Sequence, residues 1–294
     1  MKTITSLSCT GKGVVSAKGI EKLMSLTELS IGSNKLTKLD ASKNTSLTHL
    51  NANNNQLTSL DVSKNMTLTS SKTNISSNPY SEILYVYKGG KTTVGNNVKL
   101  LTQLGWDSPT WTSNDISIAT VDDNGIVTTL KSGSVQVTGT VSGKYTTTST
   151  VNVVEITSDK YEINEKNNYI IIGDSMDSNI IKNNISVSNE NVIIDVDLDN
   201  YKLYVKYEDE VLKEFDLIEY TSSQYDLSGN YIYTGDKDLD LSKIDTINCN
   251  KEVSGGKLLI KINDVVIREY DLISISSEVY DLSKEYIYVG NNEL

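Results

Sequence analysis

Residues that could support catalysis are few in this sequence and lie far apart. The single histidine, His49, has no acid or nucleophile placed beside it, whereas an enzyme needs a base, a nucleophile or a metal held against a pocket. The glycine-rich stretch from Gly11 to Gly19 lacks both the Walker order of a phosphate-binding loop and a leading hydrophobic strand. The two cysteines, Cys9 and Cys249, form neither a disulfide framework nor a metal-ligand cluster. We therefore predict that the chain is not an enzyme and that it has no catalytic residues and no cofactor.

The acidic run Asp195–Asp199 is the strongest candidate for a metal site, since oxygen ligands suit Ca²⁺. A twelve-residue calcium loop that starts at Asp195 needs Gly at its sixth position and Glu at its twelfth, but Asn200 and Lys206 stand there. Alternating aspartates on a strand share one exposed face, which explains this run and the similar run Asp236–Asp240 without an ion. We predict no metal site; a structural Ca²⁺ held by side chains from different loops is the alternative.

The charge of the chain is unevenly distributed. The net charge is −11, yet residues 1–78 carry nine Lys against four acids, while residues 155–294 carry thirteen Lys and Arg against twenty-nine acids. Nucleic acid binding needs clustered Lys and Arg, so the acidic C-terminal half argues against it. No apolar run approaches the length of a membrane span, and we predict no membrane insertion by this segment. The opening MKTITSLSC lacks the apolar core of a signal peptide, which predicts either a cytosolic protein or an internal piece of a longer one.

The most informative feature is a tandem sequence repeat, with one copy at residues 26–46 and the next at residues 47–67. Nine positions, Leu26, Leu29, Ile31, Asn34, Leu36, Leu39, Asp40, Ser42 and Asn44, recur twenty-one residues later as Leu47, Leu50, Ala52, Asn55, Leu57, Leu60, Asp61, Ser63 and Asn65. This period and the spacing L-x-x-L-x-(L/I/A)-x-x-N-x-L are typical of a leucine-rich repeat solenoid. The leucines are expected to face the core, and Asn34 and Asn55 to turn inward and satisfy backbone groups of the neighbouring turn.

Further coils flank this pair on both sides. An earlier coil, one residue longer, has Ile4, Leu7, Cys9 and Val14 in the positions of Leu26, Leu29, Ile31 and Leu36, so Cys9 is expected to be a small buried residue. After Thr67 the pattern decays, with Ser71, Thr73 and Asn78 in the positions of Leu50, Ala52 and Leu57. We predict a degenerate last coil and a solenoid over residues 1–79.

The strand positions between the buried leucines form the concave face of such a solenoid. They are Glu28, Ser30, Gly32, His49, Asn51, Asn53, Ser70, Lys72 and Asn74. We predict that a ligand site, if the chain has one, is formed there by Glu28, Ser30, His49, Asn51, Asn53 and Lys72. The face is small, polar and free of the aromatic residues that dominate protein-binding hot spots.

Residues 18–67 resemble the internalin-type leucine-rich repeats of bacterial surface proteins. The most specific match is the coil text LTSLDVSKN, which starts at Leu57. The resemblance implies an extracellular or cell-surface location, and a host or cell-surface protein or glycan as the partner of the concave face.

Residues 80–155 predict a β-sandwich. The segments Val135–Val141 and Val151–Val153 alternate with period two, and turn residues such as Ser142–Lys144 separate short strands. The sequence of residues 111–154 resembles the group 2 bacterial immunoglobulin-like domain. The matching residues are Trp111, Asp115, Ile118, Ala119, Val121, Gly125, Leu130 and Gly133. That family usually supplies a spacer. The resemblance places Trp111 in the core, while Trp106 is either packed or an exposed contact.

Residues 156–294 contain a second repeat. The text KLYVKYEDEVLKEFDLI at residues 202–218 returns as KLLIKINDVVIREYDLI at residues 257–273, and the Tyr-rich text at residues 225–233 returns at residues 280–288, both fifty-five residues later. We predict one β-repeat unit over residues 156–220 and a second, with the start of a third, over residues 221–294. They resemble clostridial-type modules that follow Ig-like domains in Gram-positive surface proteins. Tyr231 and Tyr233 are expected to share one face of their strand.

Together these patterns predict a mainly β, multi-domain chain: a short leucine-rich repeat solenoid, an Ig-like β-sandwich and tandem small β-repeat modules. The function they favour is non-enzymatic adhesion at the cell surface, with the concave face as the contact and the other modules as a spacer stalk. Two alternatives stay open, a purely structural spacer of a longer surface protein and a bacteriophage virion fibre component. The ligand and the oligomeric state do not follow from the sequence.

Overall fold

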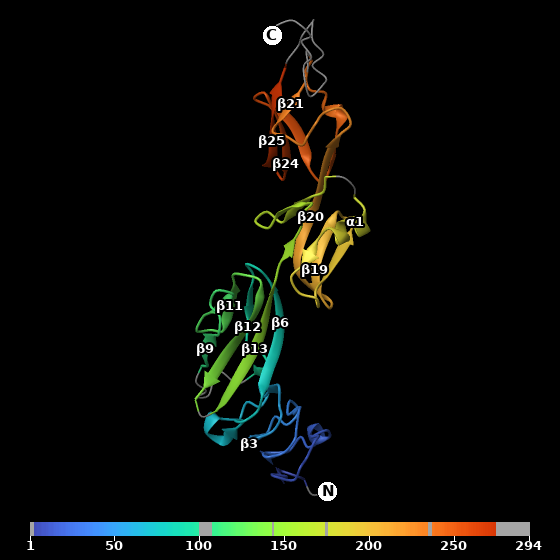
Figure 1. The fold of residues 1–294 in the computed structure, drawn as a ribbon. Coiled ribbons are helices and arrows are strands. Elements are labelled where there is room, and N and C mark those ends of the chain that lie inside the picture. Colours follow the sequence, from blue (N-terminus) through green and yellow to red (C-terminus); the bar gives the residue numbers. More distant parts are fainter. Residues whose placement is uncertain (1–2, 100–107, 143, 174–175, 235–236, 275–294) are drawn as a thin grey trace, which may run out of the picture. The chain divides into compact units, whose positions relative to one another are not determined.

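The computed structural model describes residues 3–99, 108–142, 144–173, 176–234 and 237–274 (Figure 1). The chain divides into two compact units, Met1–Glu155 and Ile156–Leu294, and each is described by itself. Both units are built mainly from β-strands, which confirms the predicted fold class. The predicted third repeat at residues 280–288, together with Trp106 and Asp236, lies outside the described residues.

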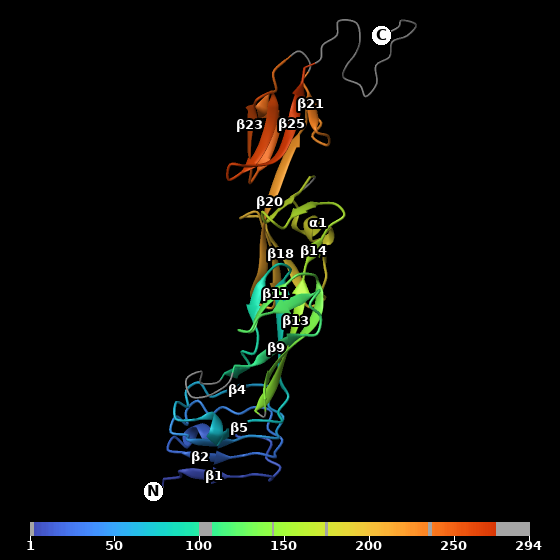
Figure 2. The ribbon, with the colours of Figure 1, turned by 90° about the vertical axis from the view of Figure 1, so that its left-hand side faces the viewer.

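The first unit begins with a solenoid whose coils stack through parallel strands (Figure 2). Leu7, Leu29, Leu50 and Thr73 stand side by side in adjacent strands, so the L-x-x-L-x-L face of each coil packs on the next. The strands are β1 (Ser6–Ser8), β2 (Glu28–Ser30), β3 (His49–Asn51) and β5 (Thr73–Asn74); η1 (Ile20–Lys22), β4 (Leu60–Asp61) and η2 (Ser70–Lys72) lie elsewhere on the coils.

Asparagine recurs at the same position of successive coils, and these side chains form a buried ladder. The Asn55 Oδ1 accepts from the Leu36 N–H at 3.1 Å, and its Nδ2 donates to the carbonyl oxygens of Ile31, Ala52 and Asn53 at 3.1–3.2 Å. Asn34 makes the same kind of contacts one coil earlier. The inward turn predicted for both residues is confirmed, and these amides replace backbone bonds that the tight turns cannot make.

The predicted register of the last coil is wrong by two residues. Leu50 pairs with Thr73, not with Ser71, and the Asn78 side chain takes the ladder position, with its Nδ2 donating to the carbonyl oxygens of Ala52, Ile75 and Ser76. Two extra residues are accommodated in the 3₁₀ turn η2, which precedes β5. The last coil is therefore complete, and the apparent decay of its sequence came from reading it without the insertion.

The Ig-like part consists of two facing sheets with a valine-rich core. One sheet has the order β6-β13-β12-β9 and the other β10-β11-β7. Side chains from both, including Val86, Val127, Val137 and Val151, form a single buried cluster. The strands are β6 (Tyr80–Tyr87), β7 (Lys91–Thr93), β8 (Val98–Lys99), β9 (Thr110–Ser113), β10 (Ala119–Val121), β11 (Ile126–Thr129), β12 (Gly133–Val141) and β13 (Tyr145–Val154).

The solenoid and the sandwich share a hydrophobic core. Val98, Val141 and Tyr145 of the sandwich belong to the same buried cluster as the coil leucines, and the rings of Tyr80 and Tyr145 meet edge to face at 6.0 Å. Strand β8 also pairs in parallel with β4 of the third coil. Burial raises the pKa of the Tyr80 hydroxyl, which donates to the Ile75 carbonyl at 3.0 Å. The sandwich thus covers the end of the solenoid, and the boundary after residue 79 remains a prediction.

The fifty-five-residue repeat of the second unit corresponds to two similar sheets, and we refer to residues 156–218 and residues 219–273 as the first and second modules. In each module, three consecutive strands pair in antiparallel fashion, and a further strand pairs in parallel with the last of them. This parallel pair is β16 with β20 in the first module and β21 with β25 in the second. The elements are β14 (Ile156–Thr157), β15 (Glu162–Asn164), β16 (Tyr169–Ile171), α1 (Ser178–Asn183), β17 (Ser186–Val187), β18 (Ile193–Asp197), β19 (Lys202–Tyr207), β20 (Glu210–Ser222), β21 (Tyr231–Tyr233), η3 (Leu241–Lys243), β22 (Ile244–Ile247), β23 (Asn250–Ser254), β24 (Lys257–Ile262) and β25 (Val265–Ile273).

The two modules have one strand in common. Strand β20 pairs with β19 and β16 up to Ile218, and its last four residues, Glu219–Ser222, pair with β22 of the second module. Tyr220 of this strand packs against the core of the second module. The predicted boundary after residue 220 lies within β20, and the division of residues 156–294 into two units remains a prediction.

Candidate functional site

An open pocket of about 560 Å³ lies on the strand face of the solenoid. Four of the residues predicted as ligand contacts line it: Ser30, His49, Asn51 and Lys72. Asn74 and Lys144 line it as well. Glu28 and Asn53, also predicted, are not among the lining residues. Whether any of these residues binds a ligand remains a prediction.

The parallel register sets the rows of this face. Glu28 stands beside His49, and Ser30 beside Asn51, which in turn stands beside Asn74. Neighbouring strands are about 4.8 Å apart, so one small ligand can touch side chains of three coils. Because of the two-residue insertion, Ser70 and Lys72 both lie in η2, and the strand of the last coil, β5, starts at Thr73 beside Leu50.

The amide groups in the pocket present hydrogen-bond donors. The Asn51 Oδ1 accepts from the Asn53 N–H at 3.3 Å, and the Asn74 Oδ1 accepts from the Ser76 N–H at 3.3 Å and the Ser76 hydroxyl at 2.9 Å. These bonds assign the amide orientations, since a backbone N–H must face the oxygen. Among the described residues, neither Nδ2 donates to a protein acceptor, so both remain available for a ligand.

The imidazole of His49 lies against the hydroxyl of Thr48. The Thr48 hydroxyl oxygen is 2.9 Å from the His49 Nδ1 and 3.1 Å from the Thr27 carbonyl oxygen. The tautomer of the ring decides whether Nδ1 donates or accepts in this contact, and Nε2 then has the opposite role in the neutral ring. A hydroxyl group of a ligand suits Nε2 in either case, because a hydroxyl can donate or accept.

Two ammonium groups belong to the pocket, and one of them comes from the sandwich. Lys144 lies at the end of the β12–β13 hairpin, and its Nζ donates to the Ser70 carbonyl at 2.9 Å. None of the residues that line the pocket carries a carboxylate. Sequence reasoning missed Lys144: the turn at Ser142–Lys144 was predicted, but no sequence signal places it beside a solenoid coil.

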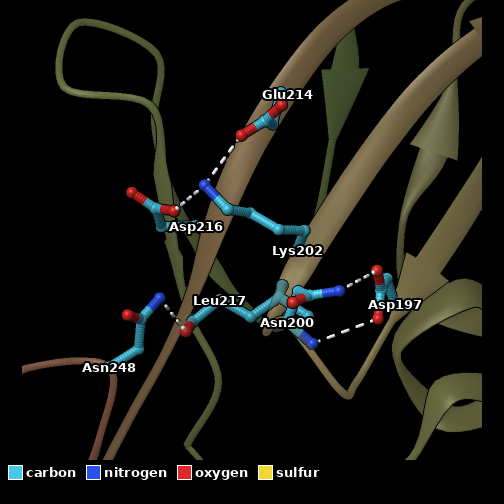
Figure 3. A network of polar contacts seen from close by, with 7 residues as sticks. All are labelled: Asp197, Asn200, Lys202, Glu214, Asp216, Leu217 and Asn248. Atoms are coloured by element: carbon cyan, nitrogen blue, oxygen red, sulfur yellow. Dashed lines mark hydrogen bonds and ion pairs between the residues drawn. The ribbon is translucent and has the colours of Figure 1, made fainter.

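Two aspartates of the acidic run that was the strongest metal candidate have protein partners, and Figure 3 shows one of them, Asp197, beside Asn200. Asp195 forms an ion pair with Lys206 at 2.5 Å, and this bond lowers the pKa of the Asp195 carboxyl. Asp197 accepts from the side chain of Asn200 at 2.8 Å and from its backbone N–H at 3.1 Å, which lowers the pKa of Asp197. Within the described parts of the chain, no three His, Cys, Asp or Glu residues are grouped to hold a metal.

The neighbouring polar contacts also stabilise the fold. Lys202 lies between Glu214 at 2.7 Å and Asp216 at 2.6 Å, while the Asn248 amide donates to the Leu217 carbonyl at 3.3 Å (Figure 3). The two carboxylates, that of Asp216 above all, raise the pKa of Lys202. An ammonium held in this way is unsuited to act as a base at neutral pH.

The two cysteines and the aromatic residues Trp111, Tyr231 and Tyr233 lie in the described parts of the chain. Burial raises the pKa of the Cys249 thiol to about 11, so the nucleophilic thiolate is scarce at neutral pH. Cys9 is half-buried, not buried as predicted, because only one coil packs against its side of the solenoid. Trp111 is half-buried over Gly95, Gly125 and Gly139, where an added Cβ would collide with its ring. Tyr231 and Tyr233 share an exposed face, with ring centroids 5.5 Å apart.

Comparison with known proteins shows likeness only among solved structures. No protein family and no curated protein matches the chain. The functional domain of InlJ from Listeria monocytogenes is 18% identical, with a TM-score of 0.29, over 51% of this chain and 43% of that one. An internalin-like protein of Listeria monocytogenes is 15% identical, with a TM-score of 0.32, over 51% of this chain and 57% of that one. A GH10 xylanase from termite gut that contains a bacterial Ig-like domain is 21% identical, with a TM-score of 0.22, over 31% of this chain and 24% of that one.

The chain therefore spans between 24% and 57% of the length of these solved structures. In the described residues, no helix combines the length and the apolar character needed to cross a membrane.

Proposed function

We propose that this chain is a binding segment of a non-enzymatic, extracellular surface protein and that its contact surface is the strand face of the solenoid. The pocket described above supports the proposal. It combines amide and ammonium donors from adjacent coils that the fold itself leaves without a full set of partners. The Asn51 and Asn74 amides each use their oxygen for a backbone N–H, and their Nδ2 donors are left to bind another molecule.

A host or cell-surface protein or a glycan is the partner class that we propose. The test is an array of glycans and of surface proteins probed with the full chain. The double substitution of His49 and Asn51 by Ala should remove the signal, because both residues line the pocket. The control replaces Lys38 and Lys64, which are exposed on the coils outside the strands, by Ala. Binding by the His49/Asn51 variant that equals binding by the parent chain would contradict the proposal.

A purely structural spacer is the second candidate, and strand β20 favours it. One strand shared by two modules leaves no flexible linker between them, as a spacer requires. An array without any hits, together with an extended scattering profile of a monomer, would support the spacer over the adhesin.

A further inference from the structure

We infer that the pocket on the strand face binds an acidic saccharide, with the carboxylate of the sugar held between Lys72 and Lys144. The inference rests on the proposed function, because it names the ligand class of the same surface. It starts from the charge of the pocket, which differs from that of the chain. The chain has a net charge of −11, whereas the pocket is lined by two lysines and by no acid.

Both lysines are available to an anion. Among the described residues, neither Lys72 nor Lys144 forms an ion pair. Lys144 donates one of its three hydrogens to the Ser70 carbonyl, and this bond holds the ammonium at the rim while two hydrogens remain. A carboxylate that accepts from the Lys144 ammonium, held by Ser70, and from the exposed Lys72 ammonium forms charge-assisted hydrogen bonds, which are stronger than neutral ones.

The remaining polar groups fit the hydroxyls of a sugar ring. The Nδ2 groups of Asn51 and Asn74 donate, and the Ser30 hydroxyl can donate or accept; the Nε2 of His49 donates or accepts according to the tautomer of the ring. A sugar hydroxyl is both donor and acceptor, so it can pair with each of these groups.

Size and chemistry disfavour a peptide or a nucleic acid. The pocket volume of about 560 Å³ lies within the range of small-ligand sites. No aromatic side chain lines the pocket, and Leu29 and Leu50 at its floor are almost fully buried, so an apolar peptide anchor finds no contact there. Two lysines are too few to follow a phosphate backbone.

The decisive experiment compares acidic oligosaccharides with their neutral counterparts. Oligosaccharides that end in glucuronic acid or sialic acid are titrated into the full chain, in parallel with the same compounds after reduction of the carboxyl group to an alcohol. We expect the acidic compounds to bind and the reduced ones to bind at least tenfold more weakly. Equal affinity for both forms would overturn the inference.

The residue-level arm uses Lys72, which has no role in the fold. Lys72→Gln should weaken binding of the acidic compounds about tenfold or more, and Lys72→Arg should retain most of it. The control is Lys35→Gln, since Lys35 is exposed on the same solenoid but does not line the pocket. Lys144→Gln is measured together with its melting temperature, because it also removes the bond to Ser70.

The outcomes separate this inference from the proposed function. Binding of a neutral glycan or a protein that is lost in the His49/Asn51 variant and unchanged in Lys72→Gln would overturn the acidic ligand and leave the surface function standing. Selective binding of acidic peptides, with no acidic saccharide bound, would also overturn it. Unchanged binding of acidic saccharides by both the Lys72 and the His49/Asn51 variants would contradict both proposals.

Discussion

The solenoid and the second unit both consist of sequence repeats, but different interactions hold the repeats together. In the solenoid, each twenty-one-residue coil lacks a core of its own, and the polar repeat, Asn34, Asn55 and Asn78, is turned inward. In the second unit, each fifty-five-residue repeat encloses its own buried residues, such as Leu203 and Phe215 or, at the equivalent positions, Leu258 and Tyr270. Its polar repeat is turned outward.

The outward repeat is an ion-pair cluster that occurs twice. Lys202 contacts Glu214 and Asp216, and fifty-five residues later Lys257 contacts Glu269 at 2.7 Å and Asp271 at 3.1 Å. The fact that a contact recurs in each repeat therefore does not indicate how much it contributes to the free energy of unfolding. A buried amide that replaces backbone bonds should matter far more than an exposed ion pair.

The largest expected effect is that of Asn55→Ala. The substitution leaves the Leu36 N–H and three carbonyls without their partner in a buried site, and we expect the free energy of unfolding of the solenoid to fall by about 3 kcal/mol. Hydrogen exchange of residues 26–68 in the full chain measures it. The control Ser46→Ala, at an exposed turn position, should change stability by less than about 0.5 kcal/mol. Similar effects of the two substitutions would refute the contrast drawn above.

An intermediate effect is expected from Tyr270→Phe in the second module. The Tyr270 ring is fully buried, and its hydroxyl donates to the Leu227 carbonyl at 3.0 Å, whereas the equivalent residue of the first module is Phe215. Loss of this bond should destabilise the module by about 1 kcal/mol, since the ring and its packing are kept. Denaturant unfolding followed by hydrogen exchange of residues 244–273 tests it. A loss above about 3 kcal/mol would mean that the modules depend on buried polar groups as the solenoid does.

The smallest effect is expected from Lys202→Met. The lysine and its two carboxylate partners are partly exposed, so solvent screening keeps their contribution below about 1 kcal/mol at neutral pH. Because the pKa of Lys202 is raised in the folded state, its contribution is fully present below the ordinary lysine pKa of about 10.4 and is lost as the pH rises through the folded value.

The stability difference between the parent chain and this variant should thus be constant from about pH 6 to pH 9 and shrink above about pH 10.5. Urea unfolding at several pH values gives this difference directly. A difference that grows in strong alkali would contradict the assigned role of the ion pair.

The sequence was sufficient to predict those features that depend on spacing within one element. Period-two and L-x-x-L patterns identified the strands and the inward residues, and the N in each coil identified the ladder. The register of the last coil was predicted wrongly because two inserted residues move its strand two positions along the sequence. The pairing of Leu50 with Thr73 in the structure reveals this shift. Lys144 could not be predicted at the pocket, since its position depends on how the sandwich packs on the solenoid.

Strand β20 has a consequence for how such a chain can grow by gene duplication. The repeat period in the sequence is fifty-five residues, but the second module includes Glu219–Ser222 at the end of a strand whose greater part belongs to the first module. A copied segment that starts at Tyr225 would lack the strand that pairs with β22. In the first module the short strand β14 pairs with β17, so a new copy needs a preceding segment that supplies such a strand, and a copy joined in frame behind an existing module receives it from the last strand of that module.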